Sequence, residues 1–332
     1  MPKKGKKDVI WNIFQESRAI VLTTHVHPDG DGIASELALF YVLSSLGKRV
    51  YIINQDKTPD MYSWLPDADK ILALEEKGPP DLSAIDLAVL MDCSSRDRIG
   101  GVYDIIKNSN RIISIDHHEG SECFRDNCYV DTSVSSIGEL LFNVIPDIKR
   151  YMDNNLATYL YVSIMTDTGS FAYSNTTKKV FQIASKLIGY GIAPDYIFRM
   201  VYNNRSMKHF RLLGKALELL KADPTGKIVH VLLSLSVYQE IGAVKEDNEG
   251  ILEVIRGLKN IDLVIMLRQL DKDRIKGSLR STNFVDCHHL SKMFGGGGHF
   301  KASGFTVNGD VDRVGNDIVR KICEEVNRLG WI

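Results

Sequence analysis

Residues 19–31, AIVLTTHVHPDGD, decide the fold expected for this chain. The run 19–25 is short, β-rich and nearly all apolar, as in a buried strand, and a polar turn follows it. A helical pattern then covers 33–46 and ends at Gly47. This order of strand, loop and helix predicts an α/β fold, in which functional residues lie just past the carboxyl ends of parallel strands.

Similar apolar runs recur along the chain and support the same interpretation. Residues 49–54, 85–92 and 111–116 are compact apolar segments that end in polar residues. Strands that are buried on both faces and separated by helices produce this pattern. We therefore expect an N-terminal domain built on a parallel sheet with flanking helices.

Helical signals dominate the next part of the chain, and strands return after a turn cluster at 222–226. A length of 332 residues favours two domains over one. We predict a first domain over 1–203, a helical linker over 204–225 and a smaller α/β domain over 226–332. The segments expected are a helix capped by Ser136 with Glu139, helices at 154–165, 178–190, 194–202 and 207–220, and strands at 228–235, 261–269 and 274–279, the last two joined by a hairpin at 271–273.

Composition limits the partners and the compartment. The 41 Lys and Arg residues against 42 Asp and Glu give a net charge of -1, which argues against a stable complex with long nucleic acid. No stretch reaches the roughly 20 apolar residues of a membrane span, so no membrane partner is expected. The five cysteines are odd in number and include no Cys-x-x-Cys pair. They argue against a disulfide framework and for a cytoplasmic location.

The first candidate site is the loop after the opening strand, which carries His25, Asp29 and Asp31 within seven residues. Oxygen ligands with some imidazole suit a hard divalent cation such as Mn²⁺ or Mg²⁺. Because Asp29 and Asp31 are two residues apart, extended backbone would point them the same way. The alternative is an ordinary turn in which an aspartate caps the following helix.

Three further segments place acidic or imidazole groups at the ends of apolar runs. Asp116, His117 and His118 follow one run, and adjacent histidines point to different sides, so one can face a metal and the other a substrate. Asp92 ends another run, and Asp167 ends an apolar helical pattern. Singly, each is more often a cap, a turn residue or a surface group. Together with the first loop, these segments supply an unusually large set of candidate metal ligands.

A glycine run provides the last candidate site. In FGGGGHFKASG, residues 294–304, the glycines can bring backbone N–H groups close to an anion, and His299 and Lys301 add donors. Arg280 and Ser281 end a predicted strand and could clamp a phosphate. The alternatives are a flexible loop and an exposed strand charge.

In their order and spacing, HVHPDGD, the Asp of MDCSS, the DHH triplet, TDTGSF and GGGGHFKASG resemble the DHH phosphoesterase superfamily with its DHH-associated C-terminal domain. The resemblance covers nearly the whole chain. The short two-domain form is similar to the branch of nanoRNases that are also phosphatases of 3'-phosphoadenosine 5'-phosphate (pAp). One departure is His27, where relatives commonly carry Asn.

The resemblance implies two divalent cations, with Mn²⁺ the expected metal and Mg²⁺ or Co²⁺ as alternatives. It implies that 1–203 is a catalytic, metal-binding domain and that 226–332 is a substrate-binding domain with a mixed sheet. The active site would lie in a cleft between the two domains. The first metal would be bound by His25, Asp29 and Asp92. The second would be bound by Asp31, Asp92, His117 and Asp167, with Asp92 bridging the two.

The resemblance also implies the groups that act on the substrate. His118 would face the scissile phosphate, and Asp116 would orient the neighbouring histidines. Arg280 would add charge stabilisation during catalysis. The pocket for the substrate phosphate would be formed by Arg280, Ser281, Gly296, Gly297, Gly298 and His299.

Short RNA oligonucleotides, hydrolysed to mononucleotides, and pAp, hydrolysed to AMP, are the substrates implied. One alternative is a phosphodiesterase for cyclic dinucleotides or their linear dinucleotide products, because the same domain pair serves that role in relatives. A remote alternative is a non-catalytic nucleotide-binding regulator, which the loss of metal ligands would favour, but none of the matched ligands is lost. Apolar positions in the helices after residue 136 could serve a homodimer as well as a core.

Overall fold

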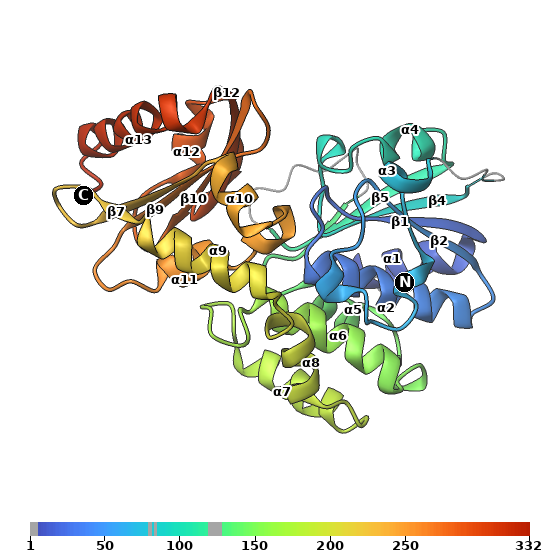
Figure 1. Ribbon diagram of the computed structural model, residues 1–332. Helices are drawn as coiled ribbons and strands as arrows, with labels where there is room; N and C mark the ends of the chain where they lie inside the picture. The colour runs from blue at the N-terminus through green and yellow to red at the C-terminus, as the bar shows by residue number, and fades with distance from the viewer. Residues whose placement is uncertain (1–5, 79–81, 83–84, 119–127) are drawn as a thin grey trace. The chain divides into compact units, whose positions relative to one another are not determined.

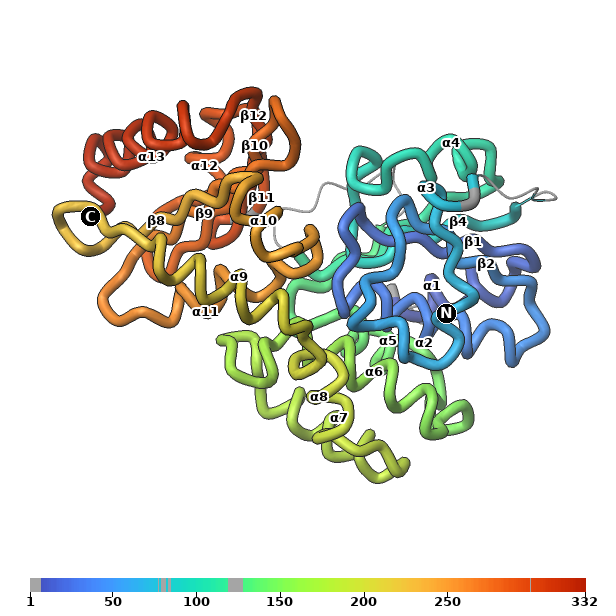
Figure 2. The backbone as a smooth tube through the Cα atoms, viewed as in Figure 1, coloured from blue at the N-terminus to red at the C-terminus, as the bar shows by residue number. Residues whose placement is uncertain are grey.

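The computed structural model describes residues 6–78, 82, 85–118 and 128–332, and the side chains of Lys6, Lys77 and His299 lie outside the description. The chain divides into two units, Met1–Asn204 and Arg205–Ile332. Each unit has its own sheet and its own hydrophobic core (Figures 1 and 2). The predicted α/β fold class is confirmed.

The first unit contains a sheet whose six strands are all parallel, in the order β3-β2-β1-β4-β5-β6. Strand order runs outward from β1 in one direction and from β4 in the other, so the two strands flank a topological switch point. Ligands of open α/β sheets bind outside the carboxyl ends of the strands at such a point. The strands are β1 (Ala19–Thr23), β2 (Arg49–Asn54), β3 (Ile71–Ala73), β4 (Leu87–Met91), β5 (Arg111–Asp116) and β6 (Cys128–Val130).

Both faces of this sheet are covered, as the continuous apolar runs predict. Successive side chains alternate between the faces: Ile20 and Leu22 belong to the core with the larger helices, whereas Val21 belongs with Ile106 to a core on the other face. Figure 1 shows helices on both sides of this sheet. The helices are α1 (Lys6–Glu16), α2 (Gly30–Ser45), α3 (Leu74–Lys77), α4 (Val102–Ile106), α5 (Ile137–Val144), α6 (Asn154–Asp167), α7 (Lys178–Ile188) and α8 (Pro194–Tyr202). Short 3₁₀ turns cover Asp60–Tyr62, Ala68–Lys70, Arg96–Arg98 and Ile148–Arg150.

One helix start and one capping contact differ from the sequence prediction. Helix α2 begins at Gly30, before the predicted residue 33, because Asp29 caps it: Asp29 Oδ1 accepts from the backbone N–H groups of Asp31 and Gly32, both at 3.1 Å. Ser136 caps α5 as predicted, but Glu139 Oε2 accepts from Ser135 N at 2.9 Å rather than from the cap residue itself. In a standard capping box the Glu side chain accepts from the N–H of the cap residue, whereas here it accepts from the N–H of the residue before the cap.

The second unit has a mixed sheet in the order β11-β12-β10-β9-β8-β7, in which only the β8–β9 pair is parallel. The β9–β10 hairpin is confirmed. Helices α12 and α13 cover one face, and α9, α10 and α11 cover the other. The elements are α9 (Met207–Glu218), β7 (Lys221–Ala222), β8 (Ile228–Leu233), α10 (Leu235–Ile241), a 3₁₀ turn (Lys245–Asn248), α11 (Ile251–Arg256), β9 (Leu263–Gln269), β10 (Arg274–Ser281), α12 (Cys287–Lys292), β11 (Gly297–His299), β12 (Ala302–Asn308) and α13 (Val311–Arg328).

Two observations concern the environment of the chain. Among the described residues, no helix is both long enough and apolar enough to span a bilayer. Cys93, Cys287 and Cys323 are free thiols, whereas Cys128 is disulfide-bonded. Neither the number nor the spacing of the cysteines indicates this bond.

Candidate metal centre

The predicted ligands gather at the carboxyl edge of the parallel sheet, at its switch point. His25 follows β1, Asp92 follows β4 directly, and Asp116 ends β5. Helix α2 adds its cap residue Asp29 and, in its first turn, Asp31. The remaining members of the cluster are His117 and His118, which follow β5, and Asp167, the last residue of α6.

Two groups of ligand atoms share Asp92. In the first, His25 Nε2 lies 3.8 Å from Asp29 Oδ2 and 3.5 Å from Asp92 Oδ2. In the second, His117 Nε2 lies 3.5 Å from Asp31 Oδ2, 3.4 Å from Asp92 Oδ1 and 3.5 Å from Asp167 Oδ2. The two oxygens of Asp92 face different histidines, so this carboxylate lies between the two groups.

The donor set fits divalent cations. Asp92 Oδ1 and His117 Nε2 are buried and have no hydrogen-bond partner, although they lie 3.4 Å apart. His25 Nδ1 lies 2.9 Å from the Val26 carbonyl oxygen, so Nδ1 carries the proton of the neutral ring and Nε2 turns its lone pair toward two carboxylates. Buried acceptors that face one another are costly unless a cation or a proton lies between them.

The pKa shifts of the clustered residues also fit a site for cations. Burial opposes charging of His25, but its contacts with Asp29 and Asp92 outweigh burial and raise its pKa to about 10. The same balance, with contacts to Asp92 and Asp31, raises the pKa of His117 to about 10. Burial and then the charge of Asp92 raise the pKa of Asp31 to about 7.

For Asp167, burial and then the charge of Asp31 raise the pKa to about 9. At Asp92 burial is outweighed by the contacts with His117 and His25, which hold its pKa far below the usual range. Without cations, His25, His117 and Asp167 therefore retain their protons at neutral pH. Metal binding would have to release these protons, as is usual when ligands must deprotonate.

Asp116 holds the two histidines in place. Its Oδ1 accepts from the backbone N–H groups of His117 at 2.8 Å and His118 at 3.1 Å, and it lies 2.8 Å from His118 Nδ1. His118 Nδ1 also lies 3.5 Å from Asp92 Oδ1, so its ring is next to the candidate ligands. Asp116 and His118 thus lie beside the candidate ligands, and their roles stay predictions.

His27 lies at the rim of the cluster rather than among the ligand groups. Its backbone is left-handed, with φ of 55°, and its N–H donates to Asp56 Oδ2. The imidazole is 66% exposed, and its Nδ1 lies 3.6 Å from the same carboxylate oxygen. Asp92, with φ of 56°, is a second left-handed residue in the centre. Such conformations are uncommon for residues other than glycine and are frequent at functional sites.

Sequence analysis missed several residues that support the ligands. Asp31 accepts from the backbone N–H of Ile137 at 2.8 Å and from the hydroxyl of Ser163. Ser163 lies in the middle of α6, within an apolar pattern that gives no sign of this contact. Asp56 and Asn54 lie at the end of β2, where the polar end of an apolar run was a signal that could have found them.

The predicted phosphate pocket of the second unit is only partly open. Arg280 and Ser281 end β10, and Arg280 Nε pairs with Glu253 Oε1 at 3.1 Å. Added Cβ atoms at Gly296 and Gly298 would lie 2.3 Å and 2.5 Å from backbone atoms of the neighbouring strand β12. These two glycines are therefore needed for close strand packing rather than only for an anion. Gly297 is exposed with open space around it, and the side chain of His299 lies outside the described residues.

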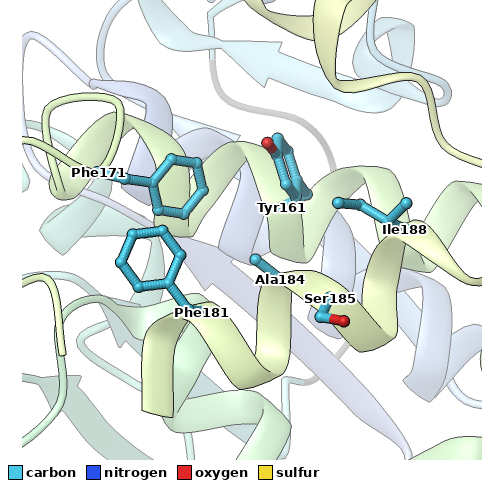
Figure 3. Close-up of a pocket in the computed structure, with 6 residues that line it drawn as sticks. All are labelled: Tyr161, Phe171, Phe181, Ala184, Ser185 and Ile188. Atoms are coloured by element: carbon cyan, nitrogen blue, oxygen red, sulfur yellow. The ribbon is translucent and has the colours of Figure 1, made fainter. Parts of the chain in front are cut away.

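A separate cavity of about 340 Å³ lies between α6 and α7 (Figure 3). Phe171 and Phe181 line it with their rings stacked, 5.6 Å between centroids and 24° between planes. The other lining residues are Tyr161, Ala184, Ser185 and Ile188. None of the predicted ligands belongs to this lining, so the cavity is distinct from the candidate metal centre.

Comparison with known proteins finds one family model that matches in each unit. Residues 19–164 match the DHH family, N-terminal domain, and residues 232–328 match the DHHA1 domain. The bifunctional oligoribonuclease and PAP phosphatase NrnA of Thermus thermophilus is 30% identical, over 94% of this chain and 92% of the relative. The protein of the same name from Bacillus subtilis is 24% identical, over 92% of this chain and 95% of that relative.

A solved structure agrees along almost the full length. The crystal structure of an exopolyphosphatase-related protein from Bacteroides fragilis matches with a TM-score of 0.89 at 30% identity, covering 97% of this chain and 96% of that chain. The two matched domains occur in the order that the motifs predict. The chain therefore belongs to the DHH family of phosphoesterases, with an N-terminal DHH domain and a C-terminal DHHA1 domain.

Proposed function

We propose that this chain hydrolyses short oligoribonucleotides to mononucleotides and pAp to AMP. The observation that carries the proposal is the placement of Asp92 between two histidine and carboxylate groups at the sheet switch point. Support for the substrates comes from the relatives that are named bifunctional oligoribonuclease and PAP phosphatase, one of which is 30% identical over 94% of this chain.

We assign the ligands of two cations, with Mn²⁺ as the proposed metal. The first ion would be held by His25, Asp29 and Asp92, and the second by Asp31, Asp92, His117 and Asp167. When bound, a pair of divalent cations lowers the pKa of coordinated water and neutralises charge on the phosphoryl oxygens. The side chain of Asp29 is 56% exposed whereas that of Asp31 is 1% exposed, so substrate would approach from the Asp29 side.

His118 is the proposed catalytic group of the protein itself. The Asp116 carboxylate accepts from the backbone N–H of His118 and also contacts Nδ1 of the His118 ring. These contacts fix the ring and leave Nε2 of His118 for the substrate. A protonated imidazole in this position would stabilise charge on the scissile phosphate and deliver a proton to the leaving oxygen. Asp116 acts through the two histidines and is a positioning residue.

Arg280 is the proposed cation for the substrate phosphate in the second unit. Replacing it with alanine is expected to lower kcat/KM for pAp by roughly 10–100-fold, because a charge-assisted hydrogen bond contributes about 1.5–3 kcal/mol. The affinity for Mn²⁺ should not change. Steady-state kinetics and calorimetry measure the two quantities.

Arg274 supplies a matched control for Arg280. It lies at the opposite end of β10 and pairs with Asp271. An R274A variant carries the same change in charge and should keep the wild-type kcat/KM. Equal losses in the two variants would contradict a specific role for Arg280.

The substrate proposal is tested by offering pAp, a linear diribonucleotide, cyclic di-AMP and inorganic pyrophosphate to the full chain with Mn²⁺. We expect release of AMP or mononucleotides from the first two and little turnover of the others. Preferred cleavage of cyclic di-AMP would replace the proposal with turnover of a cyclic dinucleotide. An H117A variant serves as the control for this assay. If the wild type hydrolyses none of these compounds faster than H117A does, an enzymatic role is contradicted.

A further inference from the structure

A hydrogen-bonded chain lies beneath the candidate metal centre and centres on Thr24. The backbone N–H of Thr24 donates to Asn54 Oδ1 at 3.0 Å, and its hydroxyl donates to the carbonyl oxygen of Met91 at 2.9 Å. Thr24 immediately precedes His25, and Met91 immediately precedes Asp92. The two bonds therefore tie together the backbone positions just before two candidate ligands, whose side chains lie 3.5 Å apart.

The chain continues from Asn54 into helix α2. Asn54 Nδ2 donates to Glu36 Oε2 at 2.9 Å. Glu36, Asn54 and Thr24 are all 0% exposed, so water does not compete for these bonds. Helix α2 also carries Asp31 in its first turn, so the network joins α2 and β2 to the ends of β1 and β4.

Glu36 has no evident structural benefit of its own. Its Oε1 is buried without a hydrogen-bond partner, and burial raises its pKa to about 8 even though the amide of Asn54 favours the charged form. A buried carboxyl with an unsatisfied oxygen is costly, and an apolar side chain would pack at this position without that cost. Its evident effect is on Asn54.

Glu36 completes the hydrogen bonding of the Asn54 amide. The N–H of Thr24 is a donor and faces Oδ1, and Glu36 Oε2 is an acceptor and faces the NH₂ group, so both partners favour the same orientation of the amide. Without the acceptor at Glu36, the NH₂ group of Asn54 would be buried without a partner. Glu36 therefore holds Asn54 in the position from which its Oδ1 accepts from Thr24.

We propose that Asn54 and Glu36 are positioning residues of the metal centre, which set the spacing of His25 and Asp92 through Thr24. The inference rests on the proposed function only in taking His25 and Asp92 as metal ligands. Among the described residues, no hydrogen bond or ion pair joins either side chain to a candidate ligand, although the charge of His25 favours the charged form of Glu36. Supporting residues of this kind typically change metal affinity by about 10–100-fold when they are replaced.

The test compares E36L with E36Q in the full-length, metal-free chain, titrated with Mn²⁺ by calorimetry. E36L removes the acceptor and is expected to weaken the Mn²⁺ affinity by roughly 10–100-fold. E36Q keeps a carbonyl oxygen for Asn54 in nearly the same shape and should stay within about 3-fold of the wild type. Hydrogen exchange at the Thr24 amide should quicken in E36L and remain slow in E36Q.

Leu187→Ala is the control for a merely structural effect. Leu187 is 0% exposed in α7 and belongs to the core of the same unit, outside the hydrogen-bonded chain. L187A should lower the melting temperature and leave the Mn²⁺ affinity unchanged. A folded E36L variant with wild-type Mn²⁺ affinity would overturn the inference.

Thr24→Val provides a second, milder variant should E36L fail to fold. It keeps the shape of the side chain and removes only the bond to Met91, so a weaker Mn²⁺ affinity is again expected, and an unchanged affinity would contradict the inference. None of these titrations uses a substrate. A wild-type chain that binds Mn²⁺ but hydrolyses nothing would overturn the proposed function and leave this inference intact.

Discussion

Asp92→Ala is expected to reduce Mn²⁺-dependent hydrolysis of pAp by at least about 10³-fold. Asp92 Oδ2 faces His25 and Asp92 Oδ1 faces His117, so one substitution removes a carboxylate from both candidate cation sites. Metal ions contribute several kcal/mol of charge stabilisation in the transition state, and each 1.36 kcal/mol corresponds to about tenfold in rate. Calorimetry should show weaker binding of both Mn²⁺ ions.

The stoichiometry of Mn²⁺ distinguishes a bridging ligand from an ordinary one. Asp29 belongs to a single group, and D29N keeps the helix cap because Asn is also a good N-cap residue. D29N should therefore weaken the binding of one of the two Mn²⁺ ions, whereas D92A should weaken the binding of both. D97N is the matched control, because Asp97 is an exposed aspartate in the 3₁₀ turn that follows. Full retention of two tightly bound ions in D92A would contradict the bridging assignment.

The position of most of the candidate ligands could be predicted because one rule governs parallel sheets. The carboxyl ends of the strands meet at one edge, so polar residues that follow β1, β4 and β5 converge there. For Asp29 the interpretation as a helix cap is confirmed, and the interpretation as a metal ligand stays a prediction that its geometry allows. Its Oδ1 caps α2, and its Oδ2 faces His25.

Supporting contacts could not be predicted because they join segments that are distant in sequence. Ile137 N–H reaches Asp31 across 106 residues, and the hydroxyl of Ser163 reaches it across 132. No periodicity carries that information. Glu36 illustrates the same limit, since a Glu inside a helix is unremarkable until the fold brings it to Asn54.

In the second unit the glycine run shows how a neighbouring strand changes the meaning of a motif. The sequence predicts that Gly296, Gly297 and Gly298 all present backbone to an anion. The structure places Gly296 and Gly298 against β12, where a Cβ atom has no room, and leaves Gly297 open. Strand β12 was not predicted, so this packing requirement could not be anticipated.

Asp167→Asn is expected to have opposite effects on stability and on metal binding. Burial, and then the charge of Asp31, raise the pKa of Asp167 to about 9 in the folded chain, against about 3.9 in an unfolded one. Between these values the folded state binds a proton that the unfolded state releases, so this group costs more stability as pH rises from about 4 to 9. Asparagine has no proton to retain and removes that cost. The same change removes a candidate ligand of the second proposed ion.

Melting temperatures of the metal-free chain across this pH range test the prediction. The gain of D167N over the wild type should be small near pH 5 and reach roughly 2–6 °C at pH 8.5, since about 1 kcal/mol shifts Tm by 2–4 °C in domains of this size. D69N, which changes an exposed aspartate, should show no such trend. Saturating Mn²⁺ should reverse the order, because ligand binding stabilises the wild type more than the variant. If metal-free D167N melts below the wild type at pH 8.5, the prediction is contradicted. Burial and the charge of Asp31 would then not destabilise the charged form of Asp167 in the folded chain.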